Sequence, residues 1–201
     1  MIHFRWLGHL STINVMPGLV KLKPATWKGI AERCETDDPR WPSHSLILRG
    51  EAPDKLSKQS FIDDVPLVDW PEYANWTSMR RLIAAARQMA ANDPVAAPFL
   101  DMEAAPSRAM LTATPKNSTM LWHNDSGAYH DAHLRFHLPL ITNPAAYSYI
   151  GPEMVHMQVG SLWWFNNKPT HCSCNWGDTM RIHLIFEIRK KVKKAADAGD
   201  L

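Results

Sequence analysis

The chain has 201 residues, of which 45% are hydrophobic and 21% are charged, and its formal net charge is +2. This length suits a single globular domain with a sizeable core, and so small a net charge gives no electrostatic reason to expect nucleic acid or an acidic membrane as a partner. The cysteines Cys34, Cys172 and Cys174 are too few for a disulfide scaffold and favour a reducing compartment. Neither a secretory signal nor a membrane span is recognisable, so we expect a cytoplasmic protein.

The N-terminal half of the chain mixes expected strands and helices. Residues 1–10 predict an opening strand, residues 24–34 a short helix with Pro24 in its first turn, and residues 43–50 a strand that ends at Gly50. Residues 51–73 are polar and interrupted by prolines, which is typical of a surface segment.

The clearest helix is expected at residues 75–90. An apolar stripe with helical spacing runs through it, and Asn75 or Thr77 can cap its first turn. The stripe consists of Met79, Leu82, Ile83 and Met89.

From about residue 107 the pattern changes to short apolar strands with turn residues between most of them. The expected strands are 108–115, 118–125, 133–141, 145–151, 153–160, 161–167, 171–176 and 180–188. Strands of this length at regular spacing indicate a sandwich, a barrel or a jelly roll.

A cluster of metal-binding residue types lies at the start of this strand-rich half. Residues two apart in a strand face the same side, so His123 and Asp125 can offer a nitrogen and an oxygen to one cation. His171, at the start of a later strand, is the expected third ligand. Two histidines and one carboxylate form the ligand set of non-haem iron(II) oxygenases, which leave positions open for a cosubstrate and oxygen.

Two arginines alternate with apolar residues in the later strands. Arg181 in MRIHLIFEI and Arg135 in HLRFHLPLI, with His137 beside it, are expected to face the interior, where an arginine is costly unless it meets an anion. The planar guanidinium suits a carboxylate, so a dicarboxylate that chelates the metal could use both arginines. The alternative is that each arginine pairs with an Asp or Glu of the chain.

Taken together, these segments resemble a known family. The H-x-D at 123–125, then LRFHLPL, then MQVGSLWWFNN, then His171 with RIHLIFE are similar to the aspartyl/asparaginyl β-hydroxylases. The resemblance covers roughly residues 106–190 and implies an iron(II)- and 2-oxoglutarate-dependent oxygenase with a double-stranded β-helix core.

The resemblance also implies roles for individual residues. His123 and His171 would be iron ligands, and Asp125 would complete the ligand triad at a position where some family members have glycine. Arg181 would hold the distal carboxylate of 2-oxoglutarate, and Arg135 with His137 would lie near the other end of this cosubstrate. A hydroxyl partner for the distal carboxylate falls near Thr112 or Thr114, between which the sequence does not decide.

We therefore expect one oxygenase domain over residues 1–201. Residues 1–105 would form supporting helices and strands, residues 106–190 a mainly β jelly-roll, cupin-like core with the metal site, and residues 191–201 a basic tail. The expected reaction uses Fe(II), 2-oxoglutarate and O2 to hydroxylate an amino acid, or an aspartyl- or asparaginyl-type side chain of a peptide, and releases succinate and CO2.

Several alternatives remain open at the level of sequence. The protein could be a non-catalytic cupin-like module that binds metal and a small acid, or a structural domain held together by zinc. Cys172 and Cys174, beside His171, could belong to such a zinc site, although small buried strand residues are the simpler interpretation. His130 and His133 lie in the loop GAYHDAH, for which either substrate contact or gating is conceivable. The sequence leaves the oligomeric state open.

Overall fold

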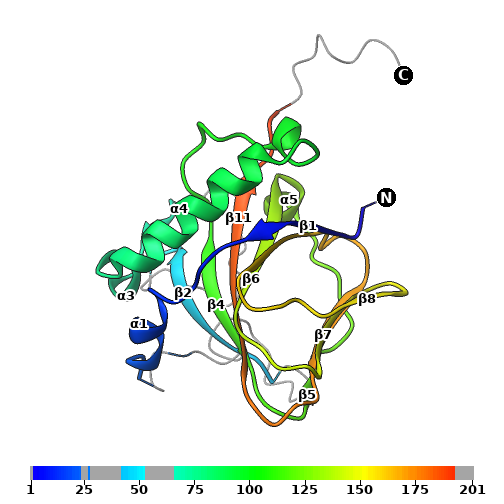
Figure 1. Cartoon of the computed structure of the whole chain (residues 1–201). Helices are drawn as coiled ribbons and strands as arrows, with labels where there is room; N and C mark the ends of the chain where they lie inside the picture. The colour runs from blue at the N-terminus through cyan, green and yellow to red at the C-terminus, as the bar shows by residue number, and fades with distance from the viewer. Residues whose placement is uncertain (1, 24–26, 28–41, 53–65, 193–201) are drawn as a thin grey trace.

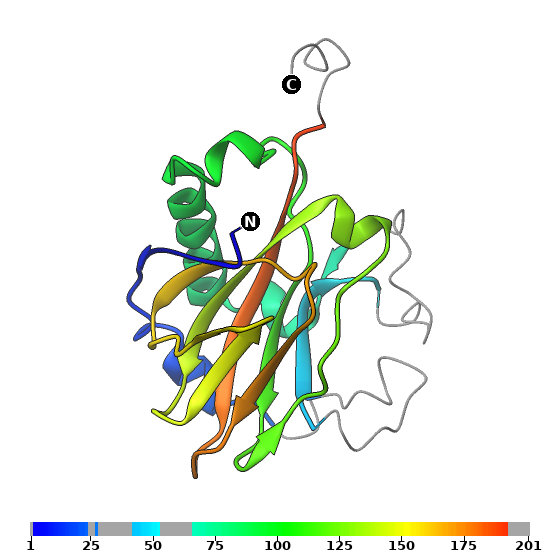
Figure 2. The ribbon, with the colours of Figure 1, turned by 90° about the vertical axis from the view of Figure 1, so that its right-hand side faces the viewer.

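The computed structural model describes residues 2–23, 27, 42–52 and 66–192. Two antiparallel sheets face each other, and the long helix α4 crosses the outer face of the larger sheet (Figure 1). The view turned by 90° shows the same layers, with β11 running through the middle of the larger sheet (Figure 2). The predicted mainly β fold is confirmed.

The larger sheet has seven strands in the order β1-β9-β6-β11-β4-β2-β3. Their bounds are β1 Phe4–His9, β9 Ser161–Phe165, β6 His133–Ile141, β11 Arg181–Arg189, β4 Ala109–Thr114, β2 His44–Gly50 and β3 Val68–Asp69. Strands that precede residue 106 therefore extend this sheet at both ends, with β1 at one end and β2 and β3 at the other.

The smaller sheet has four strands in the order β5-β10-β7-β8. Their bounds are β5 Ser118–Thr119, β10 His171–Asn175, β7 Ala146–Ile150 and β8 Glu153–Val155. The strands expected at 118–125 and 153–160 are thus shorter than predicted. Beyond β5, the predicted strand continues only as an isolated bridge between His123 and His171.

Alternation of side chains along the central strands separates an apolar layer from a polar one. In β6 and β11, one face carries buried apolar residues such as Phe136 and Leu184, which belong to the main hydrophobic core. The opposite face carries Arg135, His137 and Arg181, which point toward the smaller sheet and line a cavity there. The main core therefore lies between the larger sheet and the helices. The space between the sheets contains the polar cavity and a smaller apolar cluster of Ile150, Met157 and Phe165.

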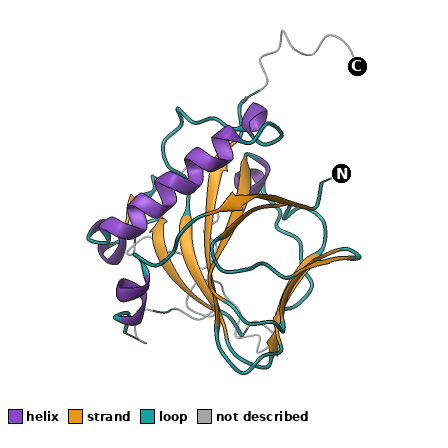
Figure 3. Ribbon diagram, in the orientation of Figure 1, coloured by secondary structure: helices purple, strands orange, loops and turns teal. Residues whose placement is uncertain are grey.

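Helices α1, α3 and α4 lie on the outer side of the larger sheet, whereas the short helix α5 lies at the cavity, which its His130 lines (Figure 3). The long helix α4 spans Thr77–Asn92 and buries Met79, Leu82 and Ile83 against the sheet, as its apolar stripe predicts. The predicted cap is wrong, because the N-cap residue is Trp76 and no side chain caps the helix. The shorter helices are α1 Met16–Val20, α3 Pro71–Ala74, η3 Ala97–Phe99 and α5 Ala128–Asp131.

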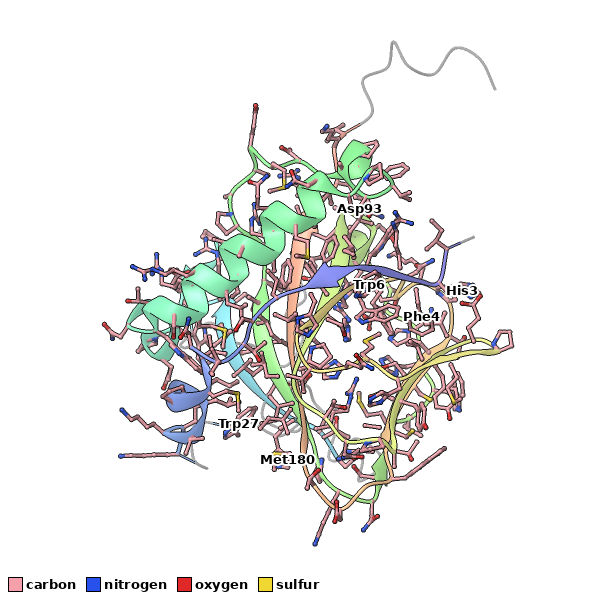
Figure 4. All side chains as sticks on the ribbon, in the orientation of Figure 1. His3, Phe4, Trp6, Trp27, Asp93 and Met180 are labelled. Carbon is pink, nitrogen blue, oxygen red and sulfur yellow. The ribbon has the colours of Figure 1, made fainter. Side chains whose placement is uncertain are left out.

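The end of α4 is tied to the edge strand β1 by an ion pair. The Nε atom of Arg5 donates to Oδ1 of Asp93 at 2.8 Å, and its Nη2 donates to Oδ2 at 2.9 Å. Figure 4 labels Asp93 at this end of the helix and Phe4 on β1, where the Phe4 ring packs edge-on against Phe165. These contacts fix β1 to the end of α4 and to the neighbouring strand β9.

The helix expected at residues 24–34 lies outside the described residues, as does most of the surface segment expected at 51–73. Within the described part of the chain, no helix is both long enough and apolar enough to cross a bilayer.

Truncation of the central core residue should measure how far the fold depends on this apolar layer. Phe136 is 0% exposed and stacks on Phe186 with ring centroids 5.3 Å apart. We expect Phe136→Ala to lower the free energy of unfolding by about 3–5 kcal/mol, because it removes buried apolar area and leaves a cavity. Urea denaturation checks this value, and a loss below about 1 kcal/mol would contradict the central place of Phe136 in the core.

Candidate active site

A cavity of about 370 Å³ opens between the two sheets. All six residues predicted from the sequence to form the site line this cavity. They are His123, Asp125, Arg135, His137, His171 and Arg181. They come from β6, β10, β11 and the segment that follows β5, so the fold brings together residues far apart in the chain.

Two backbone hydrogen bonds hold the two predicted histidine ligands side by side. The N–H of His123 donates to the carbonyl of His171 at 3.0 Å, and the N–H of His171 donates to that of His123 at 2.7 Å. The imidazole rings lie 4.2 Å apart between centroids. One potential ligand atom from each of His123, Asp125 and His171 lies within 4.8 Å of the others, which is compact enough for one ion.

The orientation of both imidazoles fits metal binding. Nδ1 of His123 lies 2.8 Å from the carbonyl oxygen of Leu121, and Nδ1 of His171 lies 3.0 Å from that of Pro169. A carbonyl oxygen can only accept, so Nδ1 carries the hydrogen and Nε2 keeps its lone pair in each neutral ring. In metal sites the ring nitrogen that does not bind the metal usually donates to such an acceptor, which fixes the orientation of the imidazole.

The side-chain hydrogen bonds of the Asp125 carboxylate all reach one of its two oxygens. Its Oδ2 accepts hydrogen bonds from Nδ2 of Asn167, at 2.9 Å, and from Nη1 of Arg135, while Oδ1 lies 3.9 Å from Nε2 of His123. Burial alone would raise the pKa of Asp125, but the charge of Arg135 and the hydrogen bond from Asn167 outweigh it and hold this pKa well below its usual range. Asp125 is therefore ionised and presents Oδ1 on the side of the histidines.

The other end of the site contains a buried arginine with neutral partners. Arg181 is 4% exposed, and its Nη2 donates to Oγ of Ser148 at 3.1 Å and to Nδ1 of His183 at 3.2 Å. No carboxylate among the described residues lies within ion-pair distance of this guanidinium, and burial lowers its pKa to about 10. A buried cation without a counter-ion is costly, so this end of the cavity suits an anionic ligand.

Two buried side chains that line the cavity together with Arg181 each carry an unsatisfied polar atom. Thr114 stands directly opposite Arg181 in the register of β4 and β11 and is 1% exposed. Within the described structure, Oγ1 of Thr114 and Nε2 of His137 are buried and have no hydrogen-bond partner. Both residues line the cavity, so both atoms are available to a ligand that Arg181 binds.

A row of rings connects the two ends of the cavity. His137 stacks on Phe165 at 4.5 Å, and the ring of Phe165 meets His171 edge-on at 5.2 Å. On its other side, Nδ1 of His137 lies 3.5 Å from Nδ1 of His183, the partner of Arg181. One ligand that reaches from the histidine pair to Arg181 would therefore pass His137.

Arg135 differs from Arg181 in having carboxylate partners. Besides Asp125, Glu187 accepts hydrogen bonds from Nε of Arg135 at 3.1 Å and from its Nη2 at 2.8 Å, both at Oε1. The alternative of pairing within the chain thus holds for Arg135, and among the described residues it does not hold for Arg181. The contact of Arg135 and His137 with a cosubstrate stays a prediction.

Three residues of this arrangement, Ser148, Glu187 and Asn167, were not named as site residues from the sequence, and Thr114 was named only as one of two candidates. Ser148, Thr114 and Glu187 face inward, and the alternation of their strands could have indicated this. Asn167 could not be found in this way, because it lies in the turn before β10 and contacts Asp125 only through the folded chain.

The loop histidines and the cysteines stand apart from the candidate metal ligands. His130 lines the cavity, whereas the ring of His133 stacks on Tyr129 at 4.0 Å and does not line it. Cys172 and Cys174 are buried, free thiols. In the described part of the chain, only His123, Asp125 and His171 form a group of potential metal ligands.

The buried imidazoles predict that the protein loses stability in acid. Burial lowers the pKa of His137 and of His183 well below the usual value of 6.5, so both stay neutral when the unfolded chain takes up protons. The free energy of unfolding should therefore fall as the pH drops below about 6.5, by about 1.4 kcal/mol per pH unit for each such histidine.

Urea unfolding at about pH 7.5 and about pH 5.5 measures this loss. His183→Gln stays neutral throughout and should show a smaller pH dependence than the wild type. Equal pH dependence in the two proteins would contradict a neutral, buried His183.

Comparison with known proteins agrees with this geometry. A family model described as aspartyl/asparaginyl beta-hydroxylase matches residues 33–191. A prolyl-4-hydroxylase from Pseudomonas putida is similar in structure, with a TM-score of 0.56 and 11% identity over 94% of this chain and 93% of that one. An oxidoreductase of the 2OG-Fe(II) oxygenase family from Burkholderia pseudomallei has a TM-score of 0.50 and 12% identity over 80% and 74%. No match was found among curated proteins.

At these identities the solved structures show the fold, which is the double-stranded β-helix expected from the sequence. The family match covers most of the chain and includes the whole candidate site. The chain belongs to the aspartyl/asparaginyl β-hydroxylase family, enzymes that hydroxylate with Fe(II), 2-oxoglutarate and O2.

Proposed function

We propose that this enzyme hydroxylates an amino acid, or an aspartyl- or asparaginyl-type side chain of a peptide, and converts 2-oxoglutarate to succinate and CO2. One observation carries this proposal. A single cavity contains a compact His-Asp-His group at one end and a buried arginine without a described carboxylate partner at the other. We further propose a cytoplasmic location, because three cysteines in 201 residues suit a reducing compartment.

The proposed metal ligands are Nε2 of His123, Nε2 of His171 and Oδ1 of Asp125. The donor set of two imidazoles and one carboxylate suits iron(II), and the backbone bridge and the hydrogen bonds of Asp125 prepare it. When bound, the iron supplies the site at which oxygen is activated. The chain contributes ligand positions and a partly buried cavity.

The proposed role of Arg181 is to hold the distal carboxylate of 2-oxoglutarate, with Oγ1 of Thr114 as a second donor. Ser148 and His183 accept hydrogen bonds from the guanidinium and orient it without neutralising its charge. His137, which lies between Arg181 and the histidine pair, is proposed to contact the cosubstrate along its length.

Arg135 is proposed to act at the metal end of the cavity. Its guanidinium is bonded to Asp125 and Glu187, so it can orient the carboxylate ligand and present its remaining donors to a bound acid. This modifies the expectation from sequence, in which Arg135 acts on the cosubstrate alone.

A metal analysis combined with an oxygen-dependent succinate assay tests the proposal. We expect iron(II)-dependent consumption of 2-oxoglutarate and O2, with one oxygen atom in succinate and the other in the hydroxylated product. Metal and 2-oxoglutarate binding without turnover would favour the non-catalytic module, and tightly bound zinc alone would favour a structural site.

The substrate is tested by screening free amino acids and short peptides for stimulation of succinate release. A substrate should gain the mass of one oxygen atom in proportion to the succinate formed. Release of succinate without a gain of oxygen in any tested compound would contradict these substrate classes.

A further inference from the structure

A buried carboxylate stands directly behind Arg135 and is not explained by the proposed reaction. Glu187 is 3% exposed and lies opposite Arg135 in the register of β11 and β6. Residues at such positions lie close enough for their side chains to interact. Glu187 does not line the cavity and does not belong to the group of potential metal ligands, so it has no direct access to a bound metal or substrate.

The contact between Glu187 and Arg135 fixes the direction of the guanidinium. Nε and Nη2 of Arg135 both donate to the same oxygen, Oε1, at 3.1 and 2.8 Å. This grip occupies one edge of the planar group and leaves Nη1 directed to Oδ2 of Asp125. The three side chains thus form a row, buried at Glu187 and partly exposed at Asp125, in which the charge of one arginine is shared between two carboxylates.

The surroundings of Glu187 keep its carboxylate in place. Its backbone N–H donates to the carbonyl of Arg108 at 3.0 Å, and Nδ1 of His130 lies 3.8 Å from Oε1. The hydroxyl of Tyr129, in α5, accepts from the N–H of Arg108 at 3.0 Å. The loop that contains Tyr129 and His130 therefore packs over the Glu187 carboxylate.

From this geometry we infer that Glu187 is a positioning residue that acts on the metal site through Arg135. The Glu187 carboxylate neutralises part of the Arg135 charge and fixes the orientation of the guanidinium. Oδ2 of Asp125 then accepts hydrogen bonds from Arg135 and Asn167, and Oδ1 stays available to the metal. Without the Glu187 charge, Arg135 would pair with Asp125 alone and compete with the metal for it. This inference rests on the proposed function and extends it beyond the three ligands.

The test is the affinity of the full-length, metal-free protein for Co²⁺, measured by calorimetry without turnover. We expect Glu187→Gln, which keeps the shape of the side chain, to raise the Co²⁺ dissociation constant about 10- to 100-fold, the usual effect of losing a second-shell partner. Glu51→Gln is the matched control, because Glu51 is 2% exposed and pairs with Arg108 at 2.9 Å without lining the cavity. It should change the dissociation constant less than about twofold.

A double-mutant cycle separates action through Arg135 from a general loss of stability or charge. In an Arg135→Gln background, Glu187→Gln should have little further effect on Co²⁺ affinity, because the group it positions is gone. If Glu187→Gln does not fold, Glu187→Asp keeps the charge but shortens the reach, and it should also raise the dissociation constant.

Three results would overturn the inference. They are an unchanged Co²⁺ affinity in folded Glu187 variants, an equal loss in Glu51→Gln, and an undiminished effect in the Arg135→Gln background. A wild-type protein that binds no metal at its His-Asp-His group would instead overturn the proposed function itself, so the two failures are distinguishable.

Discussion

An Arg181→Met protein is expected to lose most of its affinity for 2-oxoglutarate. Arg181 is a buried arginine that lines the cavity, and among the described residues its side-chain partners are neutral, with no carboxylate paired to it. Loss of a buried, charge-assisted contact costs about 2–5 kcal/mol, which corresponds to a dissociation constant raised roughly 30- to several-thousand-fold. Anaerobic calorimetric titration of the metal-loaded protein with 2-oxoglutarate measures this change.

The same substitution should change the stability of the protein little. A large loss of 2-oxoglutarate affinity together with a small change in stability identifies a residue that serves binding rather than folding. Arg181 is buried with neutral acceptors only, so its charge is desolvated without an ion pair to compensate it. Methionine fills similar space without a charge, and we expect the thermal midpoint of Arg181→Met to stay near that of the wild type or to rise.

Arg189→Ala, at the exposed end of the same strand, is the control and should bind 2-oxoglutarate normally. Arg181→Lys keeps the charge but loses the planar pair of donors. Its affinity for 2-oxoglutarate should therefore lie between that of Arg181→Met and that of the wild type. An unchanged affinity in Arg181→Met would exclude the proposed role of Arg181.

The alternation of residue types in the strands was the most informative signal in the sequence. In β6 and β11, every second side chain is apolar and most of the others are polar or charged, and this period places Arg135, His137 and Arg181 on one face. Because the period of a strand is two, the face of each residue follows from its position in the sequence. His123 and Asp125 also lie close together, with Nε2 of His123 3.9 Å from Oδ1 of Asp125, although β5 ends before them and His123 forms only an isolated bridge.

The partners of those residues depend on contacts that strand periodicity does not encode. That Arg135 meets Glu187 follows from the pairing register of β6 and β11, and that Asn167 meets Asp125 follows from the path of a turn. The prediction that Asn75 or Thr77 caps α4 was wrong for a related reason. Asn75 donates its side-chain amide to the carbonyl of Pro71, so the local sequence pattern was overridden by the adjoining short helix α3.

The second large effect is expected at the three proposed metal ligands. His123→Ala, Asp125→Ala and His171→Ala each remove one of the three atoms that lie within 4.8 Å of one another. Each should weaken metal binding by more than the roughly 10- to 100-fold typical of losing a residue that only supports a ligand, and each should abolish iron-dependent turnover of 2-oxoglutarate. Calorimetry with Co²⁺ and the succinate assay measure the two effects.

His156→Ala is the control, because Nδ1 of His156 lies 2.8 Å from the carbonyl oxygen of Ala146 and this residue neither lines the cavity nor belongs to the group of potential metal ligands. Its metal affinity should stay close to that of the wild type. The Asp125 variant adds a sharper distinction, since Asp125 is held by side chains whereas the two histidines are joined by their backbones. Asp125→Ala should therefore leave the histidine pair intact and retain weak metal binding, while turnover is lost. If all three ligand variants kept iron-dependent turnover, the metal site would have to lie elsewhere.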